Sequence, residues 1–128
     1  MAIPDAVKLV RDYLAALHPT IPVVNAVPNP LPAEFIEVRR VGGFGLRPVR
    51  DLVALDIWCW AATAPRAMQL GSDVRAEMFA LARTTLLGVD CYRVNEVLFR
   101  QQDDDETGTP RCWGTYELTL RADEVLPA

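Results

Sequence analysis

The feature that most constrains the fold is the segment 51–62, in which apolar side chains occupy every second position. Successive side chains of a β-strand point to opposite faces of a sheet, so this spacing predicts a strand with one uniformly apolar face. That face consists of Val53, Leu55, Ile57, Cys59 and Ala61. The opposite face carries Leu52, Ala54, Asp56, Trp58 and Trp60. A second layer must cover the apolar face, and amphipathic helices are its simplest cover.

The N-terminal segment has the three-and-four spacing of an amphipathic helix. Pro4 suits a first helical turn, Asp5 favours the positive end of the helix dipole, and His18-Pro19 ends the helix. The predicted apolar face consists of Val7, Val10, Leu14 and Leu17.

A second helix is predicted after Thr63, with Pro65 in its first turn. Gly88 is placed to end it with a left-handed cap. The apolar positions that trace one face are Ala67, Leu70, Val74, Met78, Leu81 and Thr85.

The remaining segments complete an α+β domain of two layers. Strands are predicted over 35–41, 92–100 and 112–121, the last two joined by a polar turn. Residues 21–27 are extended and lead into the alternate prolines of 28–32, which predict a stiff edge or connector. The run Gly42-Gly43-Phe44-Gly45-Leu46-Arg47-Pro48 is expected to be a flexible hairpin loop that exposes Phe44. We therefore expect one domain over 1–128, with a mainly antiparallel β-sheet and two amphipathic α-helices packed on one face.

Composition excludes several classes of protein. With 51% apolar residues in 128, the chain can bury a core, and a net charge of −4 argues against a protein whose main work is gripping phosphates. The N-terminus shows no charged-then-apolar leader and no apolar run is long enough to span a bilayer, so neither export nor membrane insertion is expected. The cysteines Cys59, Cys91 and Cys112 form no paired motif, and buried reduced thiols are expected.

No pattern in the sequence predicts catalysis, a cofactor or a metal. The glycine-rich run matches no phosphate-binding loop. Residues 103–108 resemble the start of a calcium loop, but the twelfth position is Gly114 and not glutamate, so a solvated hairpin tip is favoured. Ser72 is the only serine and His18 the only histidine, and neither lies in a nucleophile motif. The carboxylate pair Asp73 and Glu77 is expected on a solvated helix face. We expect a protein that is not an enzyme.

The tryptophans carry more information. Trp58, Trp60 and, by the alternation of the last strand, Trp113 fall on the face that helices on one side would leave open. Large aromatic side chains on such a surface are typical interface anchors, so these three and Phe44 are candidate interface residues. The alternative is that the N-terminal segment or the proline connector folds over them.

The order of these segments resembles the tail terminator (tail completion) proteins of long-tailed bacteriophages, especially those of actinobacterial phages and prophages. The resemblance covers essentially the whole chain: "FIEVRRVGGFG", "VALDIWCWA", a helix with Ala67, Leu70, Val74 and Arg75 in register, and a last strand reading "RCWGTYELTL". It implies a small α/β fold and a structural protein without catalytic residues. It also implies a ring, generally hexameric, that caps the head-proximal end of the tail tube, ends tube polymerisation and joins the tube to head completion proteins.

The resemblance also implies partners and a location. The partners would be further copies of the chain, the tail-tube protein and the head–tail connector, and the protein would lie in the virion after assembly in the host cytoplasm. DNA would pass through the ring without sequence-specific binding, so we hypothesise that the acidic tip Asp103, Asp104, Asp105 and Glu106 faces the lumen. The alternatives are another connector component, such as a head completion or stopper protein, and less favoured, a cytoplasmic α/β binding domain or small enzyme.

Overall fold

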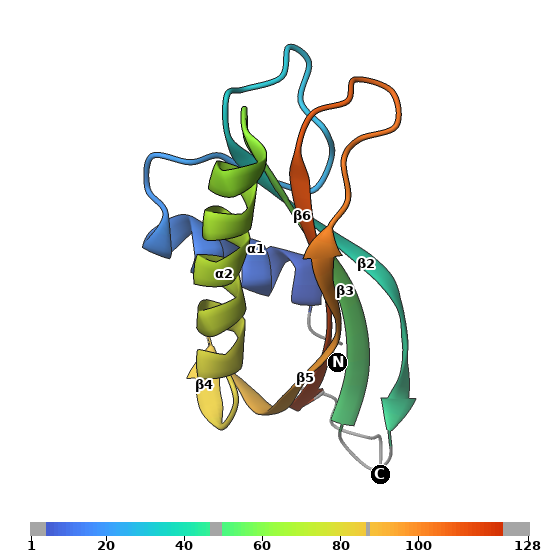
Figure 1. Cartoon of the computed structure of the whole chain (residues 1–128). Coiled ribbons are helices and arrows are strands. Elements are labelled where there is room, and N and C mark those ends of the chain that lie inside the picture. The colour runs from blue at the N-terminus through green and yellow to red at the C-terminus, as the bar shows by residue number, and fades with distance from the viewer. Residues whose placement is uncertain (1–4, 47–49, 87, 122–128) are drawn as a thin grey trace, which may run out of the picture.

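The structure is a computed structural model that describes residues 5–46, 50–86 and 88–121. These residues form two layers, with both helices on one face of a six-stranded sheet (Figure 1). The elements in chain order are α1 (Ala6–Leu17), β1 (Val23–Val24), β2 (Phe35–Leu46), β3 (Arg50–Trp60), α2 (Ala64–Ala80), β4 (Thr84–Leu86), β5 (Val89–Gln101) and β6 (Arg111–Arg121). The predicted α+β class is confirmed.

The sheet has the strand order β1-β2-β3-β6-β5-β4. Its pairs are antiparallel except that the short β1 runs parallel to β2. The central pair β3–β6 is in continuous register from Arg50↔Arg121 to Trp60↔Arg111. β1 reaches only as far as Glu37 along β2, so the rest of β2 forms a free edge of the described sheet.

Both helices begin where the sequence places a capping residue. The Asp5 side chain accepts a hydrogen bond from the Lys8 backbone N–H, and the Thr63 side chain accepts one from the Arg66 N–H. α1 ends at its C-cap His18, as predicted. The Pro4 position lies outside the described residues.

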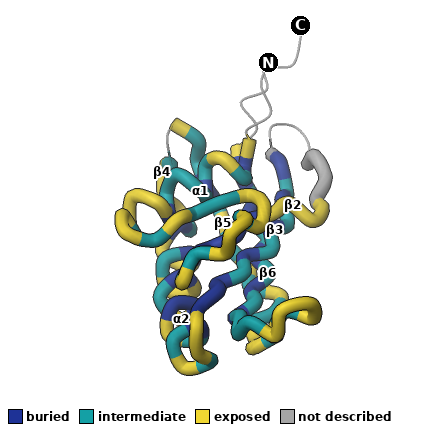
Figure 2. The backbone as a smooth tube through the Cα atoms, turned by 90° about the horizontal axis from the view of Figure 1, so that it is seen from above, coloured by how far each residue is buried: buried dark blue, intermediate teal, exposed yellow. Residues whose placement is uncertain are grey.

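One hydrophobic core joins both helices to the four long strands. The alternation predicted for β3 is confirmed, since its five inward positions from Val53 to Ala61 are almost fully buried. β6 shows the same alternation of buried and partly buried residues (Figure 2). Close packing requires Gly71 of α2 opposite Cys112, because a Cβ at Gly71 would lie 2.3 Å from the Cys112 Sγ.

Several predicted boundaries are wrong. The glycine-rich run was expected to be a loop, but its residues Gly42 to Leu46 belong to β2. They pair with β3 after a register shift between Arg40 and Gly42. Arg47 and Pro48 lie outside the described residues. Leu17 was expected on the apolar face of α1 but is 47% exposed, because the buried stripe runs through Ala6, Val10 and Leu14.

The end of α2 was also misplaced. The helix stops at Ala80 with Leu81 as C-cap, and the chain turns at Arg83, whose φ is 65°. Thr85 therefore lies in the strand β4, and Gly88 with φ 82° serves the β4–β5 turn and not a helix cap. Helical spacing alone could not show that Thr85 lies outside the helix, because a strand of three residues is too short to display its own alternation.

Candidate functional site

A stacked tryptophan pair lies on the sheet face that carries no helix, which we call the outer face. Trp58 of β3 and Trp113 of β6 are direct cross-strand partners, with ring centroids 4.6 Å apart and ring planes 12° from parallel. Both side chains are partly exposed, as the alternation predicted. The Trp113 Nε1 is buried and has no hydrogen-bond partner among the described residues. This pair is the strongest candidate interaction site on the outer face.

The exposure predicted for Trp60 is wrong. Its side chain is only 3% exposed, stacks on Phe35 with centroids 4.8 Å apart, and donates through Nε1 to the Glu37 Oε1 at 3.3 Å. The Glu37 carboxylate is itself buried and pairs with the Arg39 Nε at 2.5 Å. The physical reason is local: Phe35 begins the neighbouring strand directly opposite Trp60, so the two rings cover each other. Trp60 thus belongs to the internal packing of the chain.

Two arginines complete the aromatic rows. The Arg111 guanidinium carbon lies 4.0 Å from the Trp58 ring centroid and 4.8 Å from that of Trp60, while Arg100 lies over Trp113 at 5.1 Å. Each arrangement has the geometry of a cation–π contact. Neither arginine was predicted. Arg111 lies directly opposite Trp60 in the β3–β6 pairing, whereas the place of Arg100 opposite Trp113 depends on the β5–β6 register, which shifts between Glu96 and Leu98. Polar and aromatic groups therefore alternate across the outer face.

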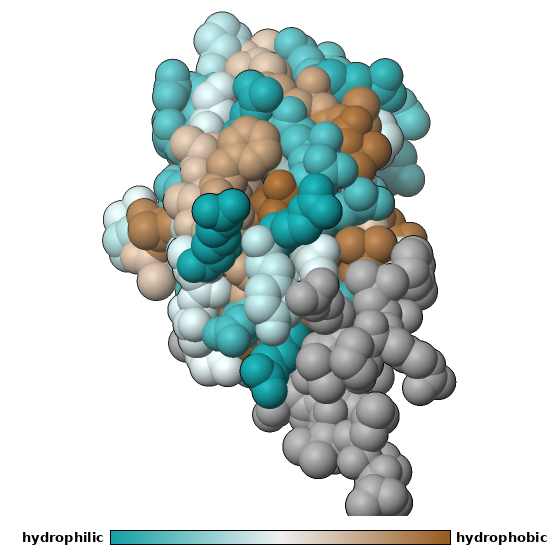
Figure 3. Space-filling model, turned by 90° about the horizontal axis from the view of Figure 1, so that it is seen from below, coloured by the Kyte–Doolittle hydropathy of each residue, from teal (hydrophilic) through white to brown (hydrophobic). Residues whose placement is uncertain are grey.

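A groove of about 650 Å³ lies over this aromatic surface. The proline connector forms one wall, the β5–β6 turn forms the other, and Trp58, Trp60 and Arg111 contribute to its lining. The predicted alternative, in which the connector folds over the tryptophans, therefore holds in part: residues 27–31 border the groove, yet Trp58 stays partly exposed. At the opposite end of the molecule, hydrophilic and apolar side chains are interspersed (Figure 3).

The acidic β5–β6 turn is an ordered structure and not a uniform charged loop. Asp104 accepts hydrogen bonds from the Thr107 N–H at 3.0 Å and its hydroxyl at 2.8 Å, which lower the pKa of this carboxyl. Asp103 accepts one from the Gln101 side chain at 3.1 Å. Asp105 and Glu106 are exposed at the apex, and no hydrogen bond or ion pair engages their side chains within the described chain. The lumen-facing orientation of this turn is a property of an assembly and stays a prediction.

Phe44, the fourth candidate interface residue, lies within β2 and pairs with Leu52 of β3. The backbone thus places it in a strand and not at a loop tip. Its side chain lies outside what the structure describes, so its interface role stays a prediction.

The three cysteines are buried, as predicted. Burial raises the pKa of the Cys91 and Cys112 thiols to about 11 each and raises that of Cys59 as well. Cys59 and Cys112 are cross-strand partners beneath α2. Protonated, buried thiols are poor nucleophiles and poor metal ligands, so their role is packing.

The single histidine ties the two helices together. The His18 Nε2 lies 2.7 Å from the Glu77 Oε1, and the Tyr13 hydroxyl donates to the Glu77 backbone oxygen at 2.8 Å. The prediction that Glu77 lies on a solvated helix face is therefore wrong. The Asp73 carboxylate accepts a hydrogen bond from the Gln69 side chain on the surface of α2. Ser72 is exposed, and within the described residues no hydrogen bond joins its hydroxyl to a base. These groups serve helix packing.

Searches for known relatives do not identify the chain. No protein-family model matches the sequence, and no curated protein matches it. Within the ranges that the structure describes, no three His, Cys, Asp or Glu side chains are grouped so as to hold a metal ion. In the same ranges, no helix is both long and apolar enough to cross a membrane. The candidate site therefore rests on the geometry of the outer face.

Proposed function

We propose that this protein is a tail terminator of a long-tailed bacteriophage, a structural protein that forms a ring on the head-proximal end of the tail tube. The ring would stop tube polymerisation and present a surface to the head–tail connector. The protein acts in this proposal through association with further copies and with the tube, without catalysis or a cofactor. Its place would be in the virion, after assembly in the host cytoplasm.

The observation that carries this proposal is the partly exposed Trp58–Trp113 stack on the helix-free face of the sheet. Aromatic side chains bordered by arginines are the residues most often found at the energetic centres of protein interfaces. A groove of about 650 Å³ over this stack offers a concave surface for a segment of a partner. The resemblance of the whole chain to tail terminators suggests that this partner is a further copy of the chain or the tail-tube protein. The aromatic groove of the outer face supports an association of this kind.

A ring also requires contacts between unlike surfaces, because a self-complementary contact closes into a dimer. Helices cover one face of the sheet, whereas the other face carries the Trp58–Trp113 stack with Arg100 and Arg111, and this difference supports contacts between unlike surfaces. Passage of DNA fits a chain of net charge −4, since an acidic wall does not hold phosphates.

The test is electron microscopy of the purified protein mixed with the tail-tube protein encoded beside it in the phage genome. Rings on one end of tubes of defined length support the proposal. Sedimentation of the protein with and without the tube protein accompanies the imaging, because terminators that are monomers alone assemble only on their partner. A chain that stays monomeric at high concentration and leaves tube length unlimited would contradict the proposal.

A different connector component is distinguished by its binding partner. A head completion or stopper protein would bind portal assemblies and leave the tube ends bare. Trp58→Ala serves as the site-directed test, because loss of capping with retained folding assigns the stack to an interface.

A further inference from the structure

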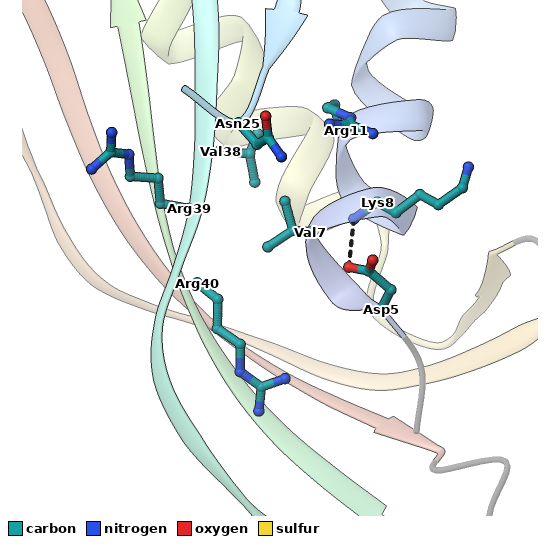
Figure 4. Close-up of a pocket in the computed structure, with 8 residues that line it drawn as sticks. All are labelled: Asp5, Val7, Lys8, Arg11, Asn25, Val38, Arg39 and Arg40. Carbon is teal, nitrogen blue, oxygen red and sulfur yellow. Dashed lines mark hydrogen bonds between the residues drawn. The ribbon is translucent and has the colours of Figure 1, made fainter. Parts of the chain in front are cut away.

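A second concave surface lies on the other side of the sheet, where the N-terminal half of α1 meets the free edge of β2 (Figure 4). This basic cleft has a volume of about 340 Å³ and is lined by Asp5, Val7, Lys8, Arg11, Asn25, Val38, Arg39 and Arg40. Four of these eight residues are basic and one is acidic. Arg39 and Arg40 are paired with the buried carboxylates of Glu37 and Asp51, so the accessible positive charge of the cleft comes from Lys8 and Arg11 of α1.

The basic groups of the cleft differ in how far they are already engaged. Arg11 has no hydrogen bond or ion pair within the described chain, and its neighbour Lys8 holds only an exposed pair with Asp12 at 2.7 Å. Arg40 extends from β2 on the side of α1, pairs with the buried Asp51 carboxylate at 3.8 Å and donates through Nε to the Gly42 carbonyl oxygen at 3.3 Å. Arg39 points to the opposite side of the strand and pairs with Glu37. Lys8 and Arg11 are thus the basic groups most available to an anionic partner.

The chain also carries an exposed anionic turn. The apex of the β5–β6 turn presents Asp105 and Glu106, both exposed and both without an internal partner among the described residues. The turn is held in shape by the bonds of Asp104 to Thr107, and Gly108 with φ 71° completes it. An ordered protruding turn enters a cleft at a lower cost in conformational entropy than a disordered one.

The turn and the cleft of one chain lie on different sides of the molecule. Asp104 and Glu106 line the groove on the outer face, whereas Lys8 and Arg11 of α1 line the cleft, and Arg39 lines both. We therefore expect the charges of the turn and of α1 to meet between two copies. A contact between two unlike surfaces repeats from copy to copy and closes into a ring when the rotation allows it.

We propose that the acidic β5–β6 turn of one copy docks into the basic cleft of a second copy, with Asp105 and Glu106 facing Lys8 and Arg11. The inference deepens the proposed ring and rests on it, because it names the surfaces by which neighbouring subunits join. A turn seated in this way does not line the lumen, so the docked and lumen-facing positions of residues 103–106 exclude each other. The unpaired carboxylates and a cleft of complementary charge favour docking.

The composition of the chain makes a sharp test possible, because Lys8 is its only lysine. A carbodiimide joins an amine to a carboxylate only when the two are in contact, so few products can form. Chains labelled with ¹⁴N and ¹⁵N are mixed at about 1 mM, where even a contact with a Kd of 1 mM is populated. They are then treated with carbodiimide and analysed by mass spectrometry. We expect mixed-isotope links between Lys8 and Asp105 or Glu106, which lessen as salt screens the charges.

Charge variants define the contact. Arg11→Glu is expected to reduce the link between copies about tenfold, since it removes one attraction and adds a repulsion. The chain that combines Arg11→Glu with Glu106→Arg exchanges the charges and restores the link from Lys8 to Asp105. Arg93→Glu is the matched control, because Arg93 is an exposed strand residue outside both surfaces and the variant changes the net charge equally.

The outcomes separate this inference from the proposed function. Absence of mixed-isotope links, or equal loss with Arg93→Glu, overturns the docking of the turn. Intact caps on tail tubes with Glu106→Arg also overturn it and favour a lumen-facing turn, while the terminator function stands. Binding of a short DNA duplex that depends on Arg11, without links between copies, assigns the cleft to phosphates instead. Failure of the wild-type chain to cap tubes, with the links present, refutes the terminator function and leaves the contact.

Discussion

Trp58 and Trp60 lie two residues apart on the same strand face. We predict that truncating Trp60 mainly lowers the stability of the fold, whereas truncating Trp58 mainly impairs association. Trp60 is 3% exposed, is stacked on Phe35 and is bonded to a buried carboxylate, so Trp60→Ala opens a cavity inside the chain. Truncation of a buried tryptophan costs about 3–5 kcal/mol. Glu37 also loses one of its two partners, which places the expected loss near the upper end, at about 4–5 kcal/mol.

The expected loss for Trp58→Ala is smaller. The ring is partly exposed, and its contacts are the stack on Trp113, typically about 0.5–1.5 kcal/mol, and the guanidinium of Arg111, about 0.5–1 kcal/mol. These contacts contribute about 1–2.5 kcal/mol beyond the apolar area that the ring buries. Because the Trp58 ring is less buried than that of Trp60, we expect the smaller loss in the free energy of unfolding for Trp58→Ala. The variant should fold and should fail to cap tail tubes.

The assay is urea unfolding followed by far-ultraviolet circular dichroism, which does not depend on the tryptophan that is removed. A loss of 4–5 kcal/mol is a large part of the stability of a small domain, so Trp60→Ala is expected to express poorly or melt early. Trp60→Phe is the second variant, because it keeps a ring on Phe35 and removes the bond to Glu37, which costs about 1–3 kcal/mol, while it leaves a smaller cavity than alanine does. Equal stability losses for Trp58→Ala and Trp60→Ala, or the reverse order, would refute the division of the two tryptophans between interface and core.

Two further predictions concern the packing of α2 on the sheet and the buried thiols. Gly71→Ala is expected to destabilise the fold by about 1–3 kcal/mol, because the new Cβ would lie 2.3 Å from the Cys112 Sγ. Urea unfolding measures this loss, with Ser72→Ala at the exposed neighbouring position as the control. Adding Cys112→Ala to the Gly71→Ala chain should recover part of the lost stability. The thiols of Cys91 and Cys112 should make stability fall above pH 9, because they ionise near the ordinary value of 9.0 in the unfolded chain and only near 11 in the folded one. This contribution is fully present below pH 9 and is lost as the pH rises to 11, up to about 3 kcal/mol for each thiol. Unfolding measured from pH 8 to 11 checks it against the Cys91→Ala chain, whose alkaline loss should be about one third smaller, because the thiols of Cys59 and Cys112, whose pKa values burial also raises, remain. An unchanged loss would contradict this origin.

Much of the fold could be predicted because it depends on local pattern. The period-two alternation of β3 and β6 and the helical spacing from Ala67 to Met78 determine which side chains face the core. Capping by Asp5 and Thr63 is equally local, since each side chain bonds a backbone N–H three residues further along the chain. Such signals survive without knowledge of the tertiary fold.

The errors occurred where the backbone departs from regular spacing. A register shift after Arg40 carries the glycine-rich run into β2, and another after Glu96 sets which residues of β5 face outward. Pattern alone cannot place such shifts, because each depends on a partner strand that is distant in sequence. The same dependence hid β4, which exists only through its pairing with β5.

The candidate site, too, was predicted only in the part that depends on local pattern. The sequence by itself determined that Trp58, Trp60 and Trp113 share one sheet face, because side chains alternate along a strand. Only the tertiary structure decided that Phe35 covers Trp60 while the partly exposed Trp58 stacks on Trp113, and that Arg11 and Arg40 line one cleft. The physical reason is that parity along a strand is a local property, whereas burial and electrostatic neighbours depend on which distant segments the fold brings into contact.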